Sequence, residues 1–450
     1  MNDDSEVLKQ LLAQQKEAKR QKANSPVIDN HDNDKKTLVF IISALAVSII
    51  GAFAITALIH HLKTAISPSS EEVVVNDSVK NTDYEFLKME NSGQNLVYSP
   101  LSIKNGLALL YAGASGNTKV QLENVLGDVT ILGKSSNITD RFSLANAVFI
   151  RNDFKKSVFN SYVKKIEETY DAEIIYDDFK NSSIINEWVN QKTFGLINNL
   201  NMNVSSDTRM ALVNALAIRL DWIHQFDSNK TTGASFKTRD NEEIIATTIT
   251  QTTHAKDIKY SVDDNTTLLV LPLEPAGDAE LEFIAIMPSN NLSDYVSTID
   301  QSTILSKIAS ATPASTPEGG LEIHIPKFKF DYELRFMEDL MSLGITDAFS
   351  SEVANFSNLA SAPLYASDAI HKANIDFSED GIKAAAVTAF GMSATAMPKP
   401  DTSAPVVIRI DRPFFFLIRD KNNNTVWFTG TVYRPNLWSD DEATYKTEIH

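Results

Sequence analysis

His371 is the first side chain in this sequence that invites a catalytic interpretation, because an imidazole can serve as a general base. A base of this kind acts on a nucleophile or on a metal-bound water. The chain has no G-x-S-x-G elbow, no H-E-x-x-H pair and no cysteine. We therefore expect that the protein is not an enzyme, and that it holds no cofactor and no catalytic metal.

Two short segments resemble ligand-binding loops only in part. The segment GASGNTK, from Gly113, has Thr118 where a phosphate-binding loop requires its second glycine. The segment DKNNNT, from Asp420, lacks both the glycine at the sixth place and the distal glutamate of a calcium-binding loop. We interpret both segments as turns.

The stretch 376–416 indicates chemistry of another kind. From Ile382 onward the even positions are apolar, small or Thr, and the odd positions carry the only charge, at Lys383. Because side chains alternate across a strand, this pattern favours a long strand with one buried face. No proline interrupts it before Pro398, and sixteen extended residues span roughly 50 Å. Since alanine-rich sequence also favours helix, a helix or a plain linker remains the alternative.

The order of features in this stretch resembles the reactive-centre loop of the serpins. A Glu-x-Gly hinge precedes small side chains, proline-rich chain and the hydrophobic run RPFFF, where the family has EEGTEAAAATA. The resemblance implies a loop that offers a bond to a protease and inserts into the main sheet after cleavage. Ile382 and Lys383 depart from the usual Thr or Ser and Glu, but by the alternation they face the core and water, so insertion should remain possible. The implied hinge residues are Glu379, Gly381, Ile382, Ala384, Ala385, Ala386 and Thr388.

Further motifs follow the family order from about residue 80 to residue 435. Residues 95–116 resemble NxFFSPxSIxxALAMLxLGAxG, and they predict a strand leading into a helix capped near Ser99 and Pro100. Residues 186–197 match a helix that crosses the main sheet, and residues 212–226 match a central strand. The resemblance implies an α+β serpin fold, with a large mixed main sheet, further sheets, surrounding helices and an exposed reactive-centre loop. Other predicted strands are 142–150, 268–273, 281–288, 413–418 and 425–432, and residues 325–330 follow the family order.

In serpins a polar cluster lies beneath the point where the strands of the main sheet part. Buried polar groups must be hydrogen-bonded, so such a cluster can hold the closed sheet and find new partners in the open one. A fixed structural network without a switching role is the alternative. The residues of this chain that match the cluster are Asn95, Ser99, Ser102, Asn214 and His371.

The reactive bond follows from the family's usual spacing. Seventeen residues counted from Glu379 end on Thr395, which predicts cleavage between Thr395 and Ala396, with Ala394 or Met392 as alternatives before the bond. A small residue there suits the pocket of an elastase-like or subtilisin-like serine protease. A trypsin-like target is disfavoured, because Lys399 is followed by Pro400.

Composition excludes several classes of partner. The chain has 450 residues, a formal net charge of −17 and 43% hydrophobic residues, enough for a large core. The acidic balance argues against nucleic acid, since phosphate binding needs clustered Lys and Arg. Without cysteine there is no disulfide and no thiolate metal site.

The N-terminal residues predict a membrane anchor. Residues 37–59 carry no charge and, as a helix, reach roughly 34 Å, enough to cross a hydrocarbon core. A signal peptide and a buried core helix are the alternatives, but this run is longer and begins later than a signal peptide's apolar region. Lys and Arg are frequent before the span, which predicts a cytoplasmic N-terminus and a periplasmic, lumenal or extracellular main domain.

The sequence thus predicts a polar tail (1–36), a transmembrane helix (37–59), a linker (60–79), a serpin domain (80–435) and an acidic tail (436–450). The implied function is a membrane-anchored, monomeric and metastable inhibitor of a serine protease, which acts as a suicide substrate. A serpin that does not inhibit and instead acts as a binding or chaperone module is the main alternative. An unrelated membrane-anchored enzyme is the third.

Overall fold

The computed structural model describes residues 82–127, 142–195, 197–200, 202, 204–205, 207–383 and 403–439. By its internal contacts the chain divides at residues 76 and 77, and the described residues belong to the second unit. The predicted span 37–59, the predicted reactive bond and the hinge residues after Lys383 lie outside the described residues. Among the helices that are described, none is long and apolar enough to cross a membrane.

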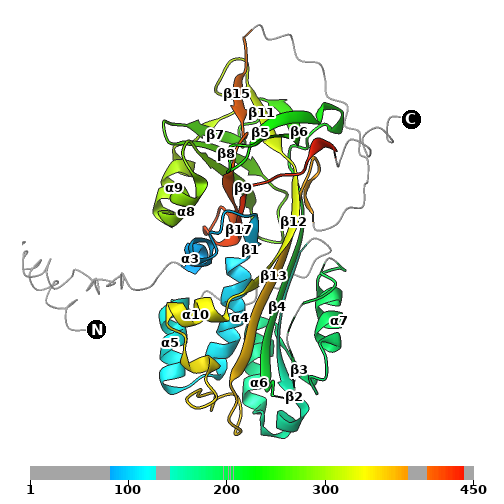
Figure 1. Ribbon diagram of the computed structural model, residues 1–450, viewed down its shortest axis with the longest axis vertical. Coiled ribbons are helices and arrows are strands. Elements are labelled where there is room, and N and C mark those ends of the chain that lie inside the picture. Colours follow the sequence, from blue (N-terminus) through cyan, green and yellow to red (C-terminus); the bar gives the residue numbers. More distant parts are fainter. Residues whose placement is uncertain are drawn as a thin grey trace, which may run out of the picture. The chain divides into compact units, whose positions relative to one another are not determined.

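Within the described residues, the main sheet has six strands in the order β12-β13-β14-β4-β2-β3 (Figure 1). The long strands β4 and β13 lie in its inner part, and the nearly continuous apolar run of β4 is typical of a strand that is buried on both faces. The strands are β2 (Phe142–Arg151), β3 (Glu173–Asp177), β4 (Met210–Asp221), β12 (Phe328–Arg335), β13 (Ala366–Phe377) and β14 (Gly381–Lys383).

Two further sheets are formed by the remaining described strands. The first has the order β1-β17-β16-β9-β8-β7-β10, with β1 (Leu96–Tyr98), β7 (Lys259–Val262), β8 (Thr266–Pro272), β9 (Leu281–Pro288), β10 (Thr312–Pro313), β16 (Phe414–Asp420) and β17 (Val426–Val432). The second has the order β15-β11-β6-β5, with β5 (Thr232–Lys237), β6 (Glu243–Thr253), β11 (Leu321–Pro326) and β15 (Val406–Arg409).

Helices cover both faces of the main sheet, and the period of two along β4 explains how. Met210 and Leu212 pack with one cluster, which includes residues of α4, whereas Ala211 and Val213 pack with residues of α7 on the opposite face (Figure 1). The described helices are α3 (Thr82–Met89), α4 (Pro100–Gly113), α5 (Gly116–Leu126), α6 (Asn160–Tyr170), α7 (Ser183–Lys192), α8 (Leu292–Ser297), α9 (Gln301–Ala309) and α10 (Met337–Leu343), with 3₁₀ turns η2 (Asn152–Ser157), η3 (Ser228–Lys230) and η4 (Asp347–Phe349).

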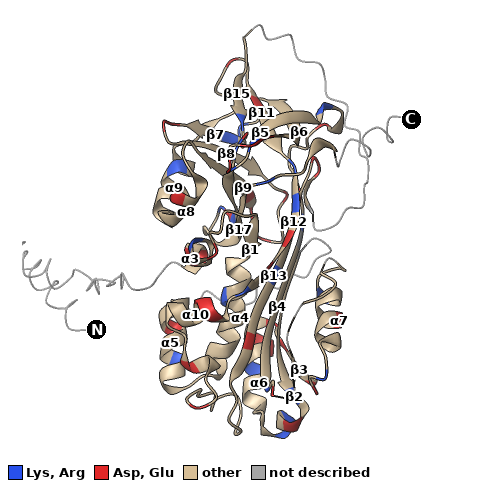
Figure 2. Cartoon of the chain, viewed as in Figure 1, with Lys and Arg blue, Asp and Glu red and all other residues tan. Residues whose placement is uncertain are grey.

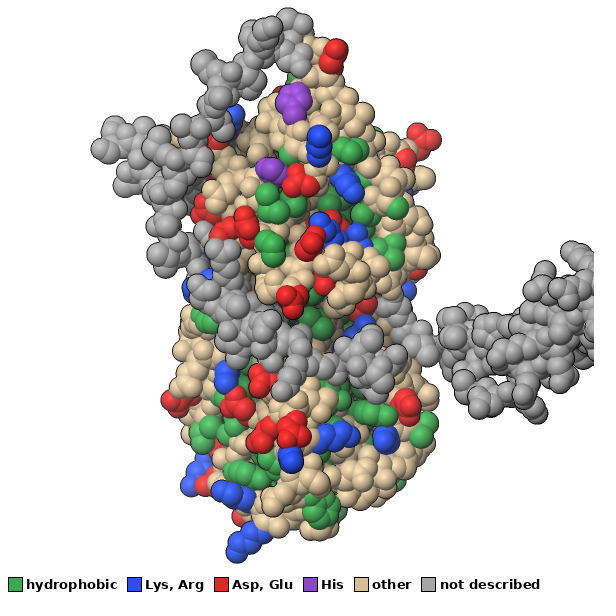
Figure 3. Space-filling view, turned by 180° about the vertical axis from the view of Figure 1, so that it is seen from behind, with side chains coloured by type: hydrophobic (Ala, Val, Ile, Leu, Met, Phe, Trp, Pro, Cys, Tyr) green, Lys and Arg blue, Asp and Glu red, His purple; other side chains and the backbone are tan. Residues whose placement is uncertain are grey.

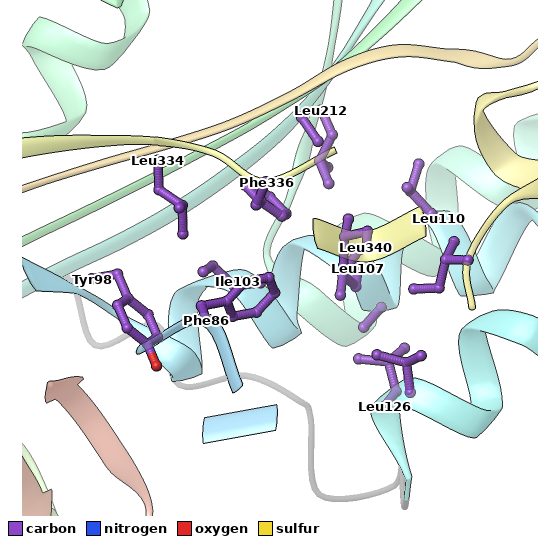
Figure 4. Packing of buried hydrophobic residues seen from close by; sticks show 14 of the residues in the cluster. Phe86, Tyr98, Ile103, Leu107, Leu110, Leu126, Leu212, Leu334, Phe336 and Leu340 are labelled. Atoms are coloured by element: carbon purple, nitrogen blue, oxygen red, sulfur yellow. The ribbon is translucent and has the colours of Figure 1, made fainter. Parts of the chain in front are cut away.

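The core beneath the main sheet joins α3, β1, α4 and α10 (Figure 4). The ring of Phe86 packs edge-on against the rings of Tyr98 and Phe336, each at 5.9 Å between centroids. The buried hydroxyl of Tyr98 donates to the carbonyl of Asp83 at 2.6 Å and accepts from the backbone N–H of Leu87 at 3.2 Å. Burial also raises the pKa of Tyr98 well above its usual value. The α3 helix is therefore fixed to β1 by both apolar and polar contacts.

The start of α4 confirms the predicted cap. Ser99 is extended at the N-cap, its hydroxyl accepts from the backbone N–H of Ser102 at 3.1 Å, and Pro100 occupies the first helical position. The predicted strands at 142–150, 268–273 and 281–288 and the two C-terminal strands are also confirmed, as β2, β8, β9, β16 and β17.

One of the two predicted turns is wrong in part. Only Ala114 and Ser115 of the segment that begins at Gly113 lie outside helices, since Gly116 already begins α5. A helix forms here instead of a turn because Thr118, Leu122 and residues further along α5 bury one face of it. The turn at Asp420 is confirmed: Asn424 has a φ of 62°, and its backbone N–H donates to the carbonyl of Asp420 at 2.9 Å.

Charged side chains of both signs are distributed over the sheets and helices (Figure 2). On the face seen in Figure 3, Lys and Arg lie among Asp and Glu, so the described residues of this face form no continuous basic surface. A strip of basic side chains of the kind that binds nucleic acid is therefore not visible on it.

Candidate functional site

The short strand β14 lies between β13 and β4 in the main sheet. It is antiparallel to β13, with Ile382 opposite Phe377, and antiparallel to β4, with Ile382 opposite Leu220. The hinge that the sequence indicated thus begins as a strand of the sheet, and the described part of this strand ends at Lys383.

Below β14, the strands β13 and β4 pair with each other directly. Their parallel pairing runs from Ala366 opposite Met210 to Lys372 opposite Ala215. From Met210 to Ala215, β4 therefore forms one ladder of backbone hydrogen bonds directly with β13. From Arg219 to Asp221 it pairs with β14 instead, and β14 forms a second ladder with β13.

Gly381 can occupy the start of β14 because it has no side chain. Its φ is +154°, and a Cβ atom at this position would lie 2.0 Å from the carbonyl oxygen of Leu220. Both the backbone conformation and the close approach of β4 require glycine.

Ile382 faces the interior, as its alternation predicted. Its side chain is 1% exposed and belongs to an apolar cluster with Leu220, Trp222 and Phe377. An apolar residue at this position of the hinge is therefore compatible with a place in the sheet.

Glu379, just before β14, is held by a partly buried ion pair. One carboxylate oxygen, Oε2, lies 3.1 Å from Nζ of Lys327, and the other, Oε1, accepts from the hydroxyl of Thr231 at 2.6 Å. The side chains of Lys327 and Glu379 are 16% and 10% exposed, so water screens this pair only weakly. The ion pair ties the hinge to the loop between β11 and β12.

Trp222, at the end of β4, holds the backbone of the same hinge. Its indole N–H donates to the carbonyl of Ser378 at 2.9 Å, and its backbone N–H donates to the carbonyl of Asp380 at 2.9 Å. Its ring packs against Phe283 and Phe377, with centroids 5.8 and 5.1 Å away. Side-chain and main-chain contacts therefore fix residues 378–380 beside β4.

A row of polar side chains crosses the main sheet where the direct pairing of β13 and β4 is about to end. His371 lies opposite Asn214, and Asn214 lies opposite Asn146 of β2. Nδ1 of His371 is 3.3 Å from Oδ1 of Asn214, and the amide nitrogen of Asn214 donates to Oδ1 of Asn146. All three residues are buried.

The first turn of α4 completes this cluster. The backbone N–H of Ser99 donates to Nε2 of His371 at 3.0 Å, and the hydroxyl of Ser102 donates to Oδ1 of Asn214. Because Nε2 accepts, the ring proton of His371 is on Nδ1, from which it points to Asn214. Burial lowers the pKa of His371 to about 3, so the imidazole is neutral near pH 7.

Asn95 does not belong to this cluster, so its assignment is corrected. Its amide donates to the carbonyl of Arg434 at 2.7 Å, and its Oδ1 accepts from the backbone N–H groups of Tyr433 and Arg434. Asn95 precedes β1, and β1 and β17 are neighbours in the seven-stranded sheet. Its side chain therefore forms hydrogen bonds with backbone groups of the segment that follows β17. Four of the five predicted residues therefore lie together, and Asn95 has a different structural role.

Asn146 belongs to the cluster, although the sequence-based prediction omits it. The signal was present: Asn146 lies between Leu144 and Val148 on the alternate positions of a strand that is otherwise apolar. A polar residue on that buried face needs a polar partner.

The remaining predicted site residues lie outside the described residues. These are Ala384, Ala385, Ala386 and Thr388 of the hinge, and Thr395 and Ala396 of the reactive bond. Within the described ranges, no group of three or more His, Asp or Glu side chains is arranged to hold a metal ion.

Comparison with protein families assigns this fold. The family described as serpin, serine protease inhibitor, matches residues 82–435. The chain belongs to the serpin family. A serine protease inhibitor of Cyanea capillata is 28% identical over 81% of this serpin and 98% of its own length. A leukocyte elastase inhibitor of Xenopus laevis is 28% identical over 78% of this chain and 96% of its own.

The solved structures agree with this assignment. The native-state crystal structure of tengpin, a thermophilic serpin, covers 80% of this chain and 94% of its own, with a TM-score of 0.65 and 26% sequence identity. The three-sheet arrangement described above is thus the serpin fold.

Proposed function

We propose that this serpin inhibits a serine protease by acting as a suicide substrate. The observation that carries the proposal is the place of β14, which already lies between β13 and β4 with Ile382 buried. The chain that follows Lys383 would extend this strand after cleavage. The relatives named as inhibitors of serine protease and of leukocyte elastase support the same conclusion.

In the proposed mechanism, the protease attacks the bond between Thr395 and Ala396 and is acylated by Thr395. Extension of β14 toward the far end of the sheet then carries the bound protease with it. Catalytic groups tolerate little displacement, and a shift of about 1 Å costs on the order of 10²-fold in rate. The acyl bond therefore persists, because the distorted protease no longer hydrolyses it.

Extension of β14 requires that β13 and β4 separate where they now pair directly. The first pairs to part would be Lys372 with Ala215 and His371 with Asn214. We assign the cluster of Ser99, Ser102, Asn146, Asn214 and His371 the role of holding these strands together before cleavage. Its polar groups can take new partners when the inserted chain arrives.

The proposed target is an elastase-like or subtilisin-like serine protease. Thr395 and Ala396 are small, so they suit a small apolar specificity pocket. The Xenopus laevis relative named as an inhibitor of leukocyte elastase supports this class.

We also propose that the inhibitor is anchored in a membrane. Residues 37–59 are uncharged and long enough to span a bilayer, so we propose a single-pass protein with a cytoplasmic N-terminus. Alkaline extraction of membranes tests this: the full chain should stay in the pellet, and a chain that begins at residue 80 should be released.

The decisive experiment incubates the chain from residue 80 with elastase-like and subtilisin-like proteases. We expect a complex that survives denaturing electrophoresis and a released peptide that begins at Ala396. The variant Ile382→Arg places a charge in the buried hinge and should be cleaved without forming the complex. Lys383→Gln, at the neighbouring alternate position, is the matched control and should still form it.

Cleavage of the wild-type chain without a complex by every serine protease tested would contradict inhibition. The chain would then be better described as a serpin that acts as a binding module. Thermal unfolding before and after cleavage gives a second readout, because insertion should stabilise the cleaved form. Equal stability of the two forms would contradict insertion.

A further inference from the structure

A small cavity lies where the turn after β5 meets three other segments of the chain. Its volume is about 260 Å³, and its walls come from Lys237, Thr238, Arg239, Asn241, residues 289–292, Arg412, Pro413 and Tyr433. Ligand cavities for drug-sized molecules start at roughly 300 Å³, so this cavity fits a small ligand. It lies away from β14 and the polar cluster, whose residues do not line it.

The charge of this cavity is opposite to that of the chain. Among the described residues that line it, Lys237, Arg239 and Arg412 are cationic and none is acidic. The whole chain has 58 acidic and only 41 basic residues, so an all-cationic lining departs from its average. Three like charges around one cavity repel one another, and an anion between them would relieve that repulsion.

Each of these cations keeps donors that are available to a ligand. Arg239 donates from Nη1 to the carbonyl of Ser92 at 2.9 Å, and Nε of Arg412 lies 3.0 Å from Oδ1 of Asp411 in an exposed pair. An Arg guanidinium has five N–H donors, so each side chain retains others. No carboxylate in the described part of the chain forms an ion pair with Lys237.

Thr238 adds a polar group without a partner. The residue is 8% exposed and lines the cavity, and its buried hydroxyl has no hydrogen-bond partner among the described residues. Buried hydroxyls are almost always hydrogen-bonded, so this one needs an acceptor. An oxygen of a ligand bound between the cations would supply it.

Backbone hydrogen bonds hold these residues in place. The N–H of Lys237, the last residue of β5, donates to the carbonyl of Asp411 at 2.8 Å, which joins β5 to the segment of Arg412. The N–H of Thr238 donates to the carbonyl of Glu242 at 2.8 Å, and Asn241, with a φ of 62°, closes the turn. The backbone that carries Lys237 is therefore set beside that of Arg412 before any ligand binds.

We propose that this cavity binds a phosphate or sulfate group of a small ligand. Tetrahedral oxyanions accept several hydrogen bonds at once and pair well with Arg and Lys. A neighbouring cavity of about 380 Å³ shares Lys237 and Arg412, and its other polar lining includes Arg409, His324 and Asp411. Because Lys237 and Arg412 line both cavities, we expect pyrophosphate, which carries more charge than phosphate, to bind more tightly.

Calorimetric titration of the full chain, in phosphate-free buffer at constant ionic strength, tests the proposal. Inorganic phosphate, sulfate and pyrophosphate are the probes. The double variant Lys237→Gln/Arg412→Gln should weaken binding by about tenfold or more, since each lost charge-assisted hydrogen bond is expensive. The variant Lys164→Gln/Arg335→Gln has the same charge change on α6 and β12, and it should bind like the wild type.

The hydroxyl of Thr238 gives a second, more specific readout. Thr238→Val keeps the shape and removes the hydroxyl, so it should weaken phosphate binding and leave the fold intact. Unchanged binding in both the double variant and Thr238→Val, or no binding of any probe, would overturn the proposal.

The phosphate group could belong to a free ligand or to a lipid headgroup, and a parallel titration with soluble dihexanoyl phosphatidic acid distinguishes them. Stronger binding of inorganic phosphate or pyrophosphate, lost in the double variant, assigns the site to a free ligand. Stronger binding of the short-chain lipid, lost in the same variant, assigns it to a headgroup. Binding of the lipid that the double variant retains would count against the site.

Discussion

Nδ1 of His371 lies 3.3 Å from Oδ1 of Asn214, and the two residues face each other across β13 and β4 just before the direct pairing of these strands ends. The contact joins the two strands that must separate if β14 is extended. The backbone N–H of Ser99 fixes the ring from the other side, at 3.0 Å from Nε2. A neutral imidazole, donor on one nitrogen and acceptor on the other, thus connects both strands to α4.

The first prediction concerns the pH dependence of stability. Burial lowers the pKa of His371 to about 3, whereas an unfolded histidine titrates near 6.5. Between these values the unfolded chain binds the proton and the folded chain does not, so stability falls as pH falls. We expect His371 to account for a loss of about 2 kcal/mol in the free energy of unfolding between pH 7 and pH 5.

Urea unfolding of the wild type and of His371→Gln at both pH values measures this contribution. The variant keeps a donor and an acceptor but cannot be protonated, so its stability should change less with pH. His254→Gln, at an exposed position, controls for the loss of an imidazole and should follow the wild type. Parallel pH profiles for the wild type and His371→Gln would contradict the prediction.

The second prediction concerns the ion pair of Glu379 and Lys327. Glu379→Lys places two ammonium groups where a partly buried pair now lies, which should cost about 3–5 kcal/mol. The reversed pair Lys327→Glu/Glu379→Lys should recover at least half of this loss. Denaturant unfolding measures both changes.

An exposed pair nearby supplies the control. Nζ of Lys329 lies 2.8 Å from Oδ2 of Asp376, but the side chain of Lys329 is 52% exposed. Lys329→Gln should therefore lower the free energy of unfolding by less than about 1 kcal/mol. If Glu379→Lys were as mild as this control, the ion pair would not hold the hinge.

The third prediction separates backbone strain from steric contact at Gly381. Gly381→Ala must accept a φ of +154° and a Cβ atom 2.0 Å from the carbonyl of Leu220, so β14 should leave the sheet. Gly344 also has a positive φ, of +110°, but a Cβ atom there would have nothing within 4 Å. We expect Gly344→Ala to lower the free energy of unfolding by about 1 kcal/mol and Gly381→Ala to lower it by clearly more.

Limited proteolysis gives the structural readout for this pair. The hinge of Gly381→Ala should be cut faster than that of the wild type, and the hinge of Gly344→Ala should not. Equal cutting of all three chains would show that the close approach to Leu220 does not matter.

The fourth prediction uses Trp222 as a reporter of insertion. Trp222 follows β4, and its ring packs on Phe377 of β13, so separation of these two strands during insertion should change its surroundings. We expect cleavage of the loop to shift the intrinsic fluorescence of the wild type. Trp222→Phe should lose most of the shift, although Trp188, Trp427 and Trp438 remain. A shift that survives this substitution would have to come from elsewhere.

Local patterns in the sequence were sufficient to predict much of this fold. The Ser99-Pro100 cap and the apolar runs of β2, β8, β9, β16 and β17 each predict an element from neighbouring residues alone, whereas β4 was predicted from its family motif. The burial of Ile382 followed in the same way. Four of the five cluster residues could be assigned because the family motifs carry them.

What the sequence could not supply is contact between distant segments. Asn95 precedes a strand of a different sheet, and nothing near it in sequence indicates that its amide caps the chain after β17. The ion pair of Lys327 and Glu379 joins residues 52 positions apart, and the cationic cavity draws on four separate segments. Such contacts depend on how the sheets pack.

The pairing of β14 with two neighbours increases the number of backbone hydrogen bonds in the main sheet. Where β13 meets β4 directly there is one backbone ladder, and where β14 lies between them there are two. Each residue added to β14 would therefore exchange one set of strand hydrogen bonds for two, and a net bond is worth about 0.5–1.5 kcal/mol. We therefore propose that lengthening this strand lowers the free energy once the contact of His371 with Asn214 has parted, and that the intact loop prevents the chain from reaching this more stable state.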